Sequence, residues 1–187
     1  TVLSIAALPF DSQPTRKKIA EAEIQRLEHH SDVCVQLSLE RLARQARDRG
    51  KDWSMGSEWV EDLIDGLVRT LLSMGLINLD LMDLRAIVQH KGGSTMLVGT
   101  GHHEQLDDLY NATIKAPLAP MNVAGAKGCL LQIEGGLGMT IGQVDEIATA
   151  LTSAVDSDAQ VILGARVSPD LEGTIRIVML LSGIGED

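Results

Sequence analysis

A helical pattern over residues 54–74 constrains the fold of this chain more than any other feature. Its apolar residues come in adjacent pairs at every fourth position: Trp59/Val60, Leu63/Ile64, Leu67/Val68 and Leu71/Leu72. Because an α-helix completes a turn in 3.6 residues, a repeat of four winds slowly around the helix axis instead of forming one straight stripe. We therefore expect a helix about 30 Å long that runs between two bodies and contacts both. This pattern divides the chain into residues 1–52, a connecting segment 53–77, and residues 78–187.

The residues before this helix predict a βαβ unit. Apolar strands are expected at 1–8 and 33–37, with amphipathic helices at 15–29 and 40–49. Near-continuous apolar strands joined by a helix are typical of a parallel sheet that is covered on both faces. Two strands alone do not form a stable sheet. We therefore expect the unit to be the remnant of a larger domain whose front half is missing from this sequence.

The residues after the helix alternate between strands and helices in a different order. We expect helices at 81–90, 104–114 and 140–153, and strands at 95–101, 128–134, 160–167 and 174–181. The economical arrangement is a mixed four-stranded sheet flanked by two or three helices. The fold class is therefore α/β for the whole chain, with a second part of α+β character.

Composition excludes several classes of function. Of the 187 residues, 44% are apolar and only 2% are aromatic, so aliphatic side chains must fill a globular core. The net charge of −10 argues against binding to nucleic acid or to an anionic membrane surface. No apolar run reaches the ~20 residues that span a bilayer, and no basic segment precedes the opening apolar run. We expect neither membrane insertion nor a signal peptide.

The cysteines and histidines do not form a metal-binding pattern. Cys34 and Cys129 each lie in an apolar, strand-like run, which is typical of buried reduced thiols in a cytosolic protein. The pairs His29-His30 and His102-His103 have adjacent side chains that diverge, and no Cys or Glu stands at zinc-ligand spacing. We predict exposed polar histidines and no metal site.

The segment from Gly75 to Arg85 predicts a sharp corner between two helices. Gly75 stands where a helix would end, Asp80 where the next would be capped, and Asp83 at its third position. Such a corner would project Asn78, Asp80 and Asp83 from a rigid junction. From the residues alone, helix capping is the favoured interpretation of the two aspartates.

The hexapeptide Asn78-Leu79-Asp80-Leu81-Met82-Asp83 resembles the synergy loop of FtsZ, the tubulin-like cell-division GTPase, in which Asn-x-Asp-x-x-Asp follows a long central helix. The resemblance covers essentially the whole chain. It includes the Gly-Thr-Gly at 99–101, the strand and Gly-Gly turn at 124–136, and the hairpin formed by 163–166 and 171–176. It implies a tubulin/FtsZ-like C-terminal domain over 78–187, preceded by a remnant of the nucleotide-binding domain.

The resemblance also implies a function and a set of site residues. It implies a cytoplasmic protein of septation that assembles head to tail into filaments and meets other division proteins. In that reading Asn78, Asp80 and Asp83 enter the nucleotide pocket of the neighbouring subunit, where the two carboxylates orient the water that attacks the γ-phosphate. GTP or GDP, which Mg²⁺ could accompany, would be bound mainly by the missing half with its Gly-Gly-Gly-Thr-Gly-Thr-Gly loop. This chain alone is therefore not expected to be active, since Gly135-Gly136-Leu137-Gly138 matches no phosphate-binding motif.

The expected base-binding residues depart from the family. Trp53 matches an aromatic residue that stacks on guanine, although packing on the sheet would explain it equally well. Ser57 replaces an Asn or Asp that bonds the guanine edge, and Leu39 replaces an Asn. A serine hydroxyl cannot make the bidentate contact of a carboxylate. Two alternatives to the active GTPase therefore stay open: a divergent scaffold filament with weak or no hydrolysis, and a stand-alone interaction domain without a nucleotide role.

Overall fold

The computed structural model describes most of the chain, namely residues 2–48, 64–65, 68–69, 75–90, 92–114 and 122–185. The helix expected over 54–74 therefore lies largely outside the described residues, and its two described pairs, 64–65 and 68–69, are helical. Trp53 and Ser57 also lie outside them. The division of the chain at 53–77 stays a prediction.

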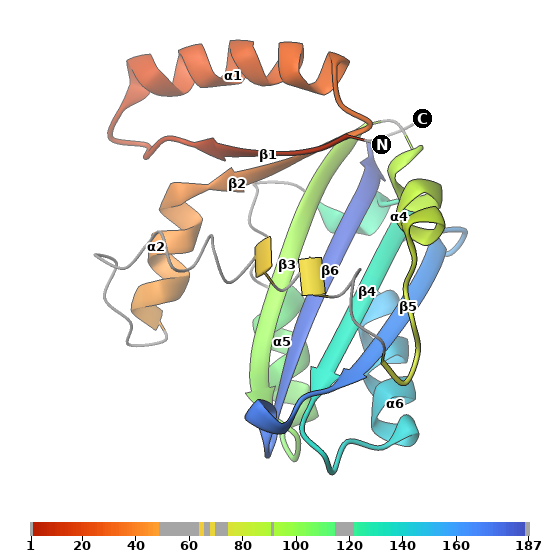
Figure 1. Ribbon diagram of the computed structural model, residues 1–187. Helices are drawn as coiled ribbons and strands as arrows, with labels where there is room; N and C mark the ends of the chain where they lie inside the picture. The colour runs from red at the N-terminus through yellow and green to blue at the C-terminus, as the bar shows by residue number, and fades with distance from the viewer. Residues whose placement is uncertain are drawn as a thin grey trace.

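The first part of the chain is the βαβ unit that the sequence predicts. It comprises strand β1 (Leu3–Leu8), helix α1 (Pro14–His29), strand β2 (Val33–Ser38) and helix α2 (Leu39–Asp48). The two strands pair in parallel, with Leu3 opposite Val33, and α1 lies along them (Figure 1). Pro14 begins α1, because its fixed φ suits the first helical turn and its missing N–H would have no partner there.

The second part contains a mixed four-stranded sheet, which confirms the predicted fold class. Its strands are β3 (Gly93–His102), β4 (Gly128–Gly135), β5 (Gln160–Val167) and β6 (Thr174–Ile184), in the order β3-β6-β4-β5. β6 pairs antiparallel with both β3 and β4, whereas β4 and β5 are parallel. The last strand in sequence is therefore inside the sheet, and β5 is an edge strand.

Helices cover both faces of this sheet. They are α4 (Leu81–Val88), α5 (Leu106–Ile114) and α6 (Ile141–Thr152), with short 3₁₀ turns η2 (Val123–Gly125) and η3 (Pro169–Leu171) between strands. α5 and α6 lie together on one face, and α4 lies toward the other beside β4 and β5 (Figure 1). The observed ends of α4 agree closely with the prediction of a helix at 81–90: α4 begins at Leu81, as predicted, and ends at Val88, two residues before the predicted end.

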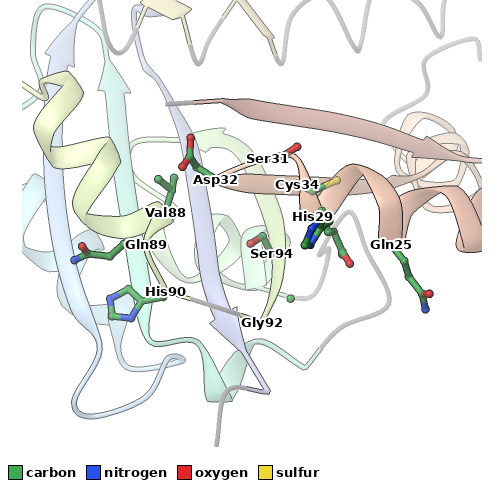
Figure 2. Close-up of a pocket in the computed structure, with 12 residues that line it drawn as sticks. Gln25, His29, Ser31, Asp32, Cys34, Val88, Gln89, His90, Gly92 and Ser94 are labelled. Atoms are coloured by element: carbon green, nitrogen blue, oxygen red, sulfur yellow. The ribbon is translucent and has the colours of Figure 1, made fainter.

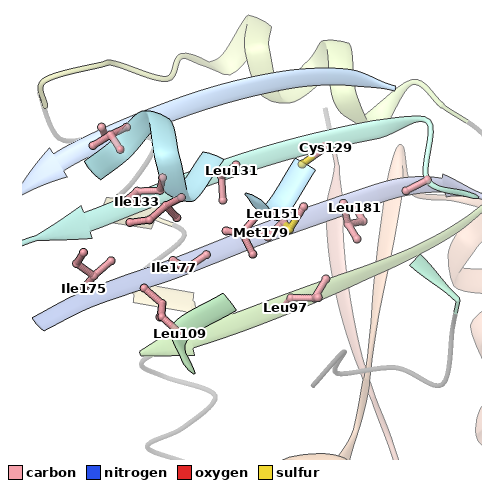
Figure 3. Packing of buried hydrophobic residues seen from close by; sticks show 14 residues of the cluster. Leu97, Leu109, Cys129, Leu131, Ile133, Leu151, Ile175, Ile177, Met179 and Leu181 are labelled. Atoms are coloured by element: carbon pink, nitrogen blue, oxygen red, sulfur yellow. The ribbon is translucent and has the colours of Figure 1, made fainter. Parts of the chain in front are cut away.

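Each face of the sheet has its own apolar core, because successive side chains of a strand point to opposite faces. The α5/α6 core contains the odd-numbered residues of β4 and β6 (Figure 3); its buried members include Leu97, Leu109, Cys129, Leu131, Ile133, Leu151, Ile175, Ile177, Met179 and Leu181. The α4 core contains the even-numbered residues of the same strands; its buried members are Val35, Leu37, Leu42, Leu79, Leu84, Ile87, Val88, Met96, Leu130, Val178 and Leu180. The two cores are separated only by the sheet.

The α4 core also joins the two parts of the chain. Val35 and Leu37 of β2 and Leu42 of α2 are buried in it together with Leu130 and Leu180 of the four-stranded sheet. The βαβ unit therefore packs directly on the second sheet. We call this contact the seam between the two parts of the chain, and we expect a substitution in it to affect the packing of both.

Candidate functional site

The segment before α4 is attached to the edge of the four-stranded sheet. We call residues 75–80 the corner loop; it runs beside β5 (Figure 1). Ile77 and Ala165 form an antiparallel bridge in which each N–H donates to the other's carbonyl, at 3.0 and 2.9 Å. The corner loop therefore pairs with the edge of the sheet at one residue, Ile77.

Side chains of the corner loop alternate between the protein interior and solvent. Ile77 packs against the α5/α6 core, and Leu79, only 6% exposed, is buried in the α4 core. The loop thus straddles the sheet edge with one apolar side chain on each face. Asn78 and Asp80 are consequently held outward and are exposed.

Two glycines allow this close approach of loop and strand. A Cβ on Gly75 would run into the carbonyl oxygen of Ala165, and a Cβ on Gly164 would lie 2.6 Å from Cγ of Leu79. The sequence predicts Gly75 as a helix-ending residue; in the structure its requirement comes from the approach to β5. The partner of each glycine could not be read from the sequence, because the loop and the strand are almost ninety residues apart.

The two aspartates of the loop form a capping box at the start of α4. Oδ1 of Asp80 accepts hydrogen bonds from the N–H groups of Met82 at 2.7 Å and Asp83 at 2.9 Å. Oδ2 of Asp83 accepts from the N–H of Asp80 at 2.9 Å. The capping interpretation is confirmed, with Asp in the position that Glu or Gln usually fills.

Capping uses only one oxygen of each carboxylate. Within the described ranges, no hydrogen bond or ion pair reaches Oδ2 of Asp80 or Oδ1 of Asp83. Asp80 is exposed, and Asp83 is half-buried. Asn78 is oriented in a similar way, because its Oδ1 accepts a 2.6 Å hydrogen bond from the N–H of Gly75. Three polar side chains are thus fixed at one atom each and present other atoms at the surface.

A row of charged residues crosses the sheet near the bridge. Glu134 on β4 stands opposite Arg166 on β5 and Arg176 on β6. The Glu134 carboxylate pairs with Arg166 through Oε1, and lies 3.7 Å from Nη1 of Arg176 through Oε2. Arg166 follows directly after Ala165, so this ion pair fixes the part of β5 that holds the loop.

The cysteine predictions agree with the structure, and the histidine pairs are largely exposed. Cys34 and Cys129 are both buried and free. Burial raises the pKa of the Cys129 thiol to about 12; the pKa of Cys34 is raised chiefly by burial and further by Glu28. Among the described residues no cluster of three or more His, Cys, Asp or Glu side chains could hold a metal ion.

A polar cavity of about 630 Å³ lies elsewhere, at the seam between the two parts of the chain (Figure 2). It is bounded by the end of α1 and the start of β2 on one side, and by Val88–His90 and the start of β3 on the other. These residues follow the C-terminal end of α4, whereas Asp80 caps its N-terminal end. Because eight helical residues span about 12 Å, the cavity and the corner loop are separate features.

Sequence reasoning identified the outward residues of the loop and missed those that hold it. Ile77, Leu79 and Gly164 carry no chemical motif. The alternation of apolar and polar residues over 76–80 was an available signal of an extended segment, and glycine inside the β5 pattern was a signal of close backbone approach.

None of the helices in the described ranges combines the length and apolar character needed to cross a membrane.

Comparison with known proteins gives consistent matches. The sequence pattern of the FtsZ family, C-terminal domain, matches residues 92–185, which is half of the chain. Cell division protein FtsZ 2 of Methanocaldococcus jannaschii is 27% identical over 191 residues, covering 98% of this chain and 50% of that protein.

Solved structures give the same result. An empty FtsZ dimer from M. jannaschii superposes with a TM-score of 0.87 and 25% identity, over 98% of this chain and 55% of that one. CetZ2 from Haloferax volcanii, in a GTPγS-bound protofilament, superposes with a TM-score of 0.73 over 99% of this chain and 56% of that one; at 16% identity this likeness shows the fold alone. The chain spans about half the length of these relatives. The family resemblance predicted from the sequence is confirmed: the chain belongs to the FtsZ family of tubulin-like cell-division proteins.

Proposed function

We propose that the corner loop is a synergy loop that triggers GTP hydrolysis in the nucleotide site of the neighbouring subunit of a filament. The observation that carries the proposal is the outward placement of Asn78 and Asp80 on a segment whose Ile77 and Leu79 are anchored in two cores. A group that acts in a second molecule must be exposed, and it must also be held in place before the partner arrives. The similar solved structures include an empty FtsZ dimer and a GTPγS-bound CetZ2 protofilament, which supports self-association of a protein with this fold.

The carboxylates of Asp80 and Asp83 are suited to orient a water molecule. Each is fixed through one oxygen by backbone N–H donors, and within the described residues its other oxygen accepts no hydrogen bond. In hydrolysis the water oxygen bonds to the γ-phosphorus, and the bond to the β,γ-bridging oxygen breaks. That oxygen keeps the electron pair on GDP, and the proton ends on the released phosphate and solvent. Phosphoryl transfer depends mainly on positioning and electrostatics, so a pre-oriented acceptor is sufficient for this role.

The proposal also includes the division of the chain into domains, the contacts to the nucleotide and the association of subunits. Residues 1–52 would be part of a nucleotide-binding domain, 53–77 the connecting helix, and 78–187 the domain that carries the loop. Trp53 and Ser57 would contact the guanine base, and most of the GTP or GDP contacts would come from sequence outside this chain. Head-to-tail association would bring each corner loop to the nucleotide of the next subunit.

The test separates catalysis from helix capping by replacing each aspartate with asparagine in the full-length protein. Asn is about as good an N-cap as Asp at position 80, and at position 83 its amide oxygen can accept the same hydrogen bond from the Asp80 N–H. Asp80→Asn and Asp83→Asn should therefore keep the fold and GTP affinity while removing the charge. We expect assembly-dependent phosphate release to fall by about 10²-fold or more, the usual scale for a lost proton acceptor or orienting group. Normal turnover in both variants would refute the assignment.

A second candidate function is a divergent scaffold filament with weak or no hydrolysis. Leu39 stands where the family resemblance implies an Asn, and a leucine side chain has no polar group to offer a base. It begins α2 and packs against the α4 core. Phosphate release measured against protein concentration distinguishes the two functions. A protein that assembles but releases no phosphate at any concentration is the scaffold.

A further inference from the structure

We propose that Gly164 of β5 is a positioning residue for the corner loop: by leaving space for Leu79 it sets where Asn78 and Asp80 stand. The proposal deepens the catalytic role above and rests on it. Gly164 is far from α4 in sequence and carries no functional group, so its effect on the reaction is entirely steric.

The space at Gly164 is filled by Leu79. A Cβ at this position would lie 2.6 Å from Cγ and 2.7 Å from Cδ1 of Leu79, below the 3.0 Å that real Cβ contacts keep. It would also meet Oε1 of Gln132, which is the end of a flexible side chain. Gln132 is itself only 5% exposed, but the atom that clashes is the terminal oxygen of its side chain, whereas Cγ of Leu79 lies near the base of a side chain enclosed by the α4 core. An alanine methyl must therefore displace Leu79 or the strand in addition to this oxygen.

The displacement falls on the loop because β5 is held more firmly. β5 pairs with β4 along its whole length, from Gln160 to Val167, whereas the backbone of the corner loop is paired with β5 at one residue, Ile77. Leu79 lies between that bridge and the capping box. Its immediate neighbours are Asn78 and Asp80, so a shift of its backbone moves both polar side chains.

A small shift is enough to impair the proposed reaction. Catalytic groups misplaced by about 1 Å can lower a rate by about 100-fold. A purely structural role for Gly164 predicts a different result, since glycine inside a strand is unfavourable on propensity and alanine would be tolerated. Only the positioning role requires that the space at Gly164 be kept free for Leu79, so filling that space distinguishes it from a purely structural role.

The experiment is a size exchange in the full-length protein with four variants: Gly164→Ala, Leu79→Ala, the double variant, and Gly125→Ala as a matched control. A Cβ on Gly125 would meet nothing closer than 4.0 Å. We expect Gly164→Ala to lower the turnover number about 10- to 100-fold with GTP affinity unchanged. Leu79→Ala removes the two Leu79 atoms that clash and leaves only the Gln132 oxygen, so the double variant should turn over GTP at least about fivefold faster than Gly164→Ala alone. The control should match the wild type.

Hydrogen exchange over residues 75–83 gives a readout that does not depend on catalysis. Gly164→Ala should speed exchange there, and adding Leu79→Ala to it should reverse the change. Wild-type turnover or exchange in Gly164→Ala, or a double variant as slow as the product of the single effects, overturns the inference. A wild-type protein without GTP turnover overturns the proposed function instead, and the exchange data still decide the role of Gly164. Should Gly164→Ala not fold, a further loss on adding it to Leu79→Ala overturns the inference, and no loss supports it.

Discussion

Asp80 and Asp83 show how one carboxylate can serve folding and function together. A carboxylate has two oxygens, and the capping box occupies one on each residue. The backbone N–H groups that donate these hydrogen bonds also restrict the orientation of each carboxylate. Capping and catalysis are therefore compatible interpretations of the same residues, and the first supplies the rigidity that the second needs.

The two cysteines should differ in reactivity although both are buried. Burial raises the pKa of Cys129 from 9.0 to about 12, so at pH 8 its thiolate fraction is about 10³-fold below that of an unperturbed thiol. We expect a thiol reagent to modify Cys129 at least about 10³-fold more slowly in folded than in denatured protein. Cys34 lines the seam cavity (Figure 2) and should be modified first. Mass spectrometry of the labelled peptides checks the order; equal rates for Cys129 in folded and denatured protein would contradict it.

The same raised pKa gives stability a definite pH dependence. The folded state keeps the Cys129 proton up to about pH 12, whereas an unfolded thiol loses it near pH 9.0. The contribution of the buried thiol is therefore fully present below pH 9 and is lost as the pH rises from there toward 12.

β5 is an edge strand, and the corner loop covers part of its open side. Edge strands present unpaired N–H and C=O groups, which proteins usually protect. The bridge between Ile77 and Ala165 satisfies one such pair and at the same time anchors the loop. Protection of a sheet edge and placement of the candidate catalytic groups thus depend on the same contact.

The charged row on β4, β5 and β6 should contribute unequally to stability. The side chain of Glu134 is 10% exposed and that of Arg166 15%, whereas Arg176 is 41% exposed. Glu134→Ala leaves Arg166 without its carboxylate in a mostly buried position, and we expect a loss of about 3 kcal/mol in the free energy of unfolding. Arg176→Ala removes a solvent-screened partner and should cost less than about 1 kcal/mol. Denaturant titration of both variants measures the difference, and equal losses would contradict this ranking.

The whole molecule depends on a core shared between its two parts. Leu37 of β2 is fully buried in the α4 core, against the same cluster as Leu180 of β6. Leu37→Ala should cost about 2–5 kcal/mol and should also speed hydrogen exchange in β6, because the cavity opens next to both sheets. Ile19→Ala on α1, at a side chain 60% exposed, is the control. Faster exchange confined to β1 and β2 would show that the two parts are stabilised independently.

Local sequence accounts for most of the fold and for the outward half of the site. Apolar periodicity and turn residues predicted the βαβ unit, the strands and helices of the second sheet, and the cap at Asp80, because each depends on residues a few positions apart. The strand order β3-β6-β4-β5 depends instead on pairings between segments distant in sequence, such as Gly128 with Gln160 and Gly93 with Ile184. The anchoring of Ile77 likewise depends on Ala165. No local pattern specifies which strand edge a loop will meet, or that Leu79 will fill the space at Gly164. Those contacts exist only after the sheet has assembled, and packing against its two faces fixes where the residues of the corner loop stand.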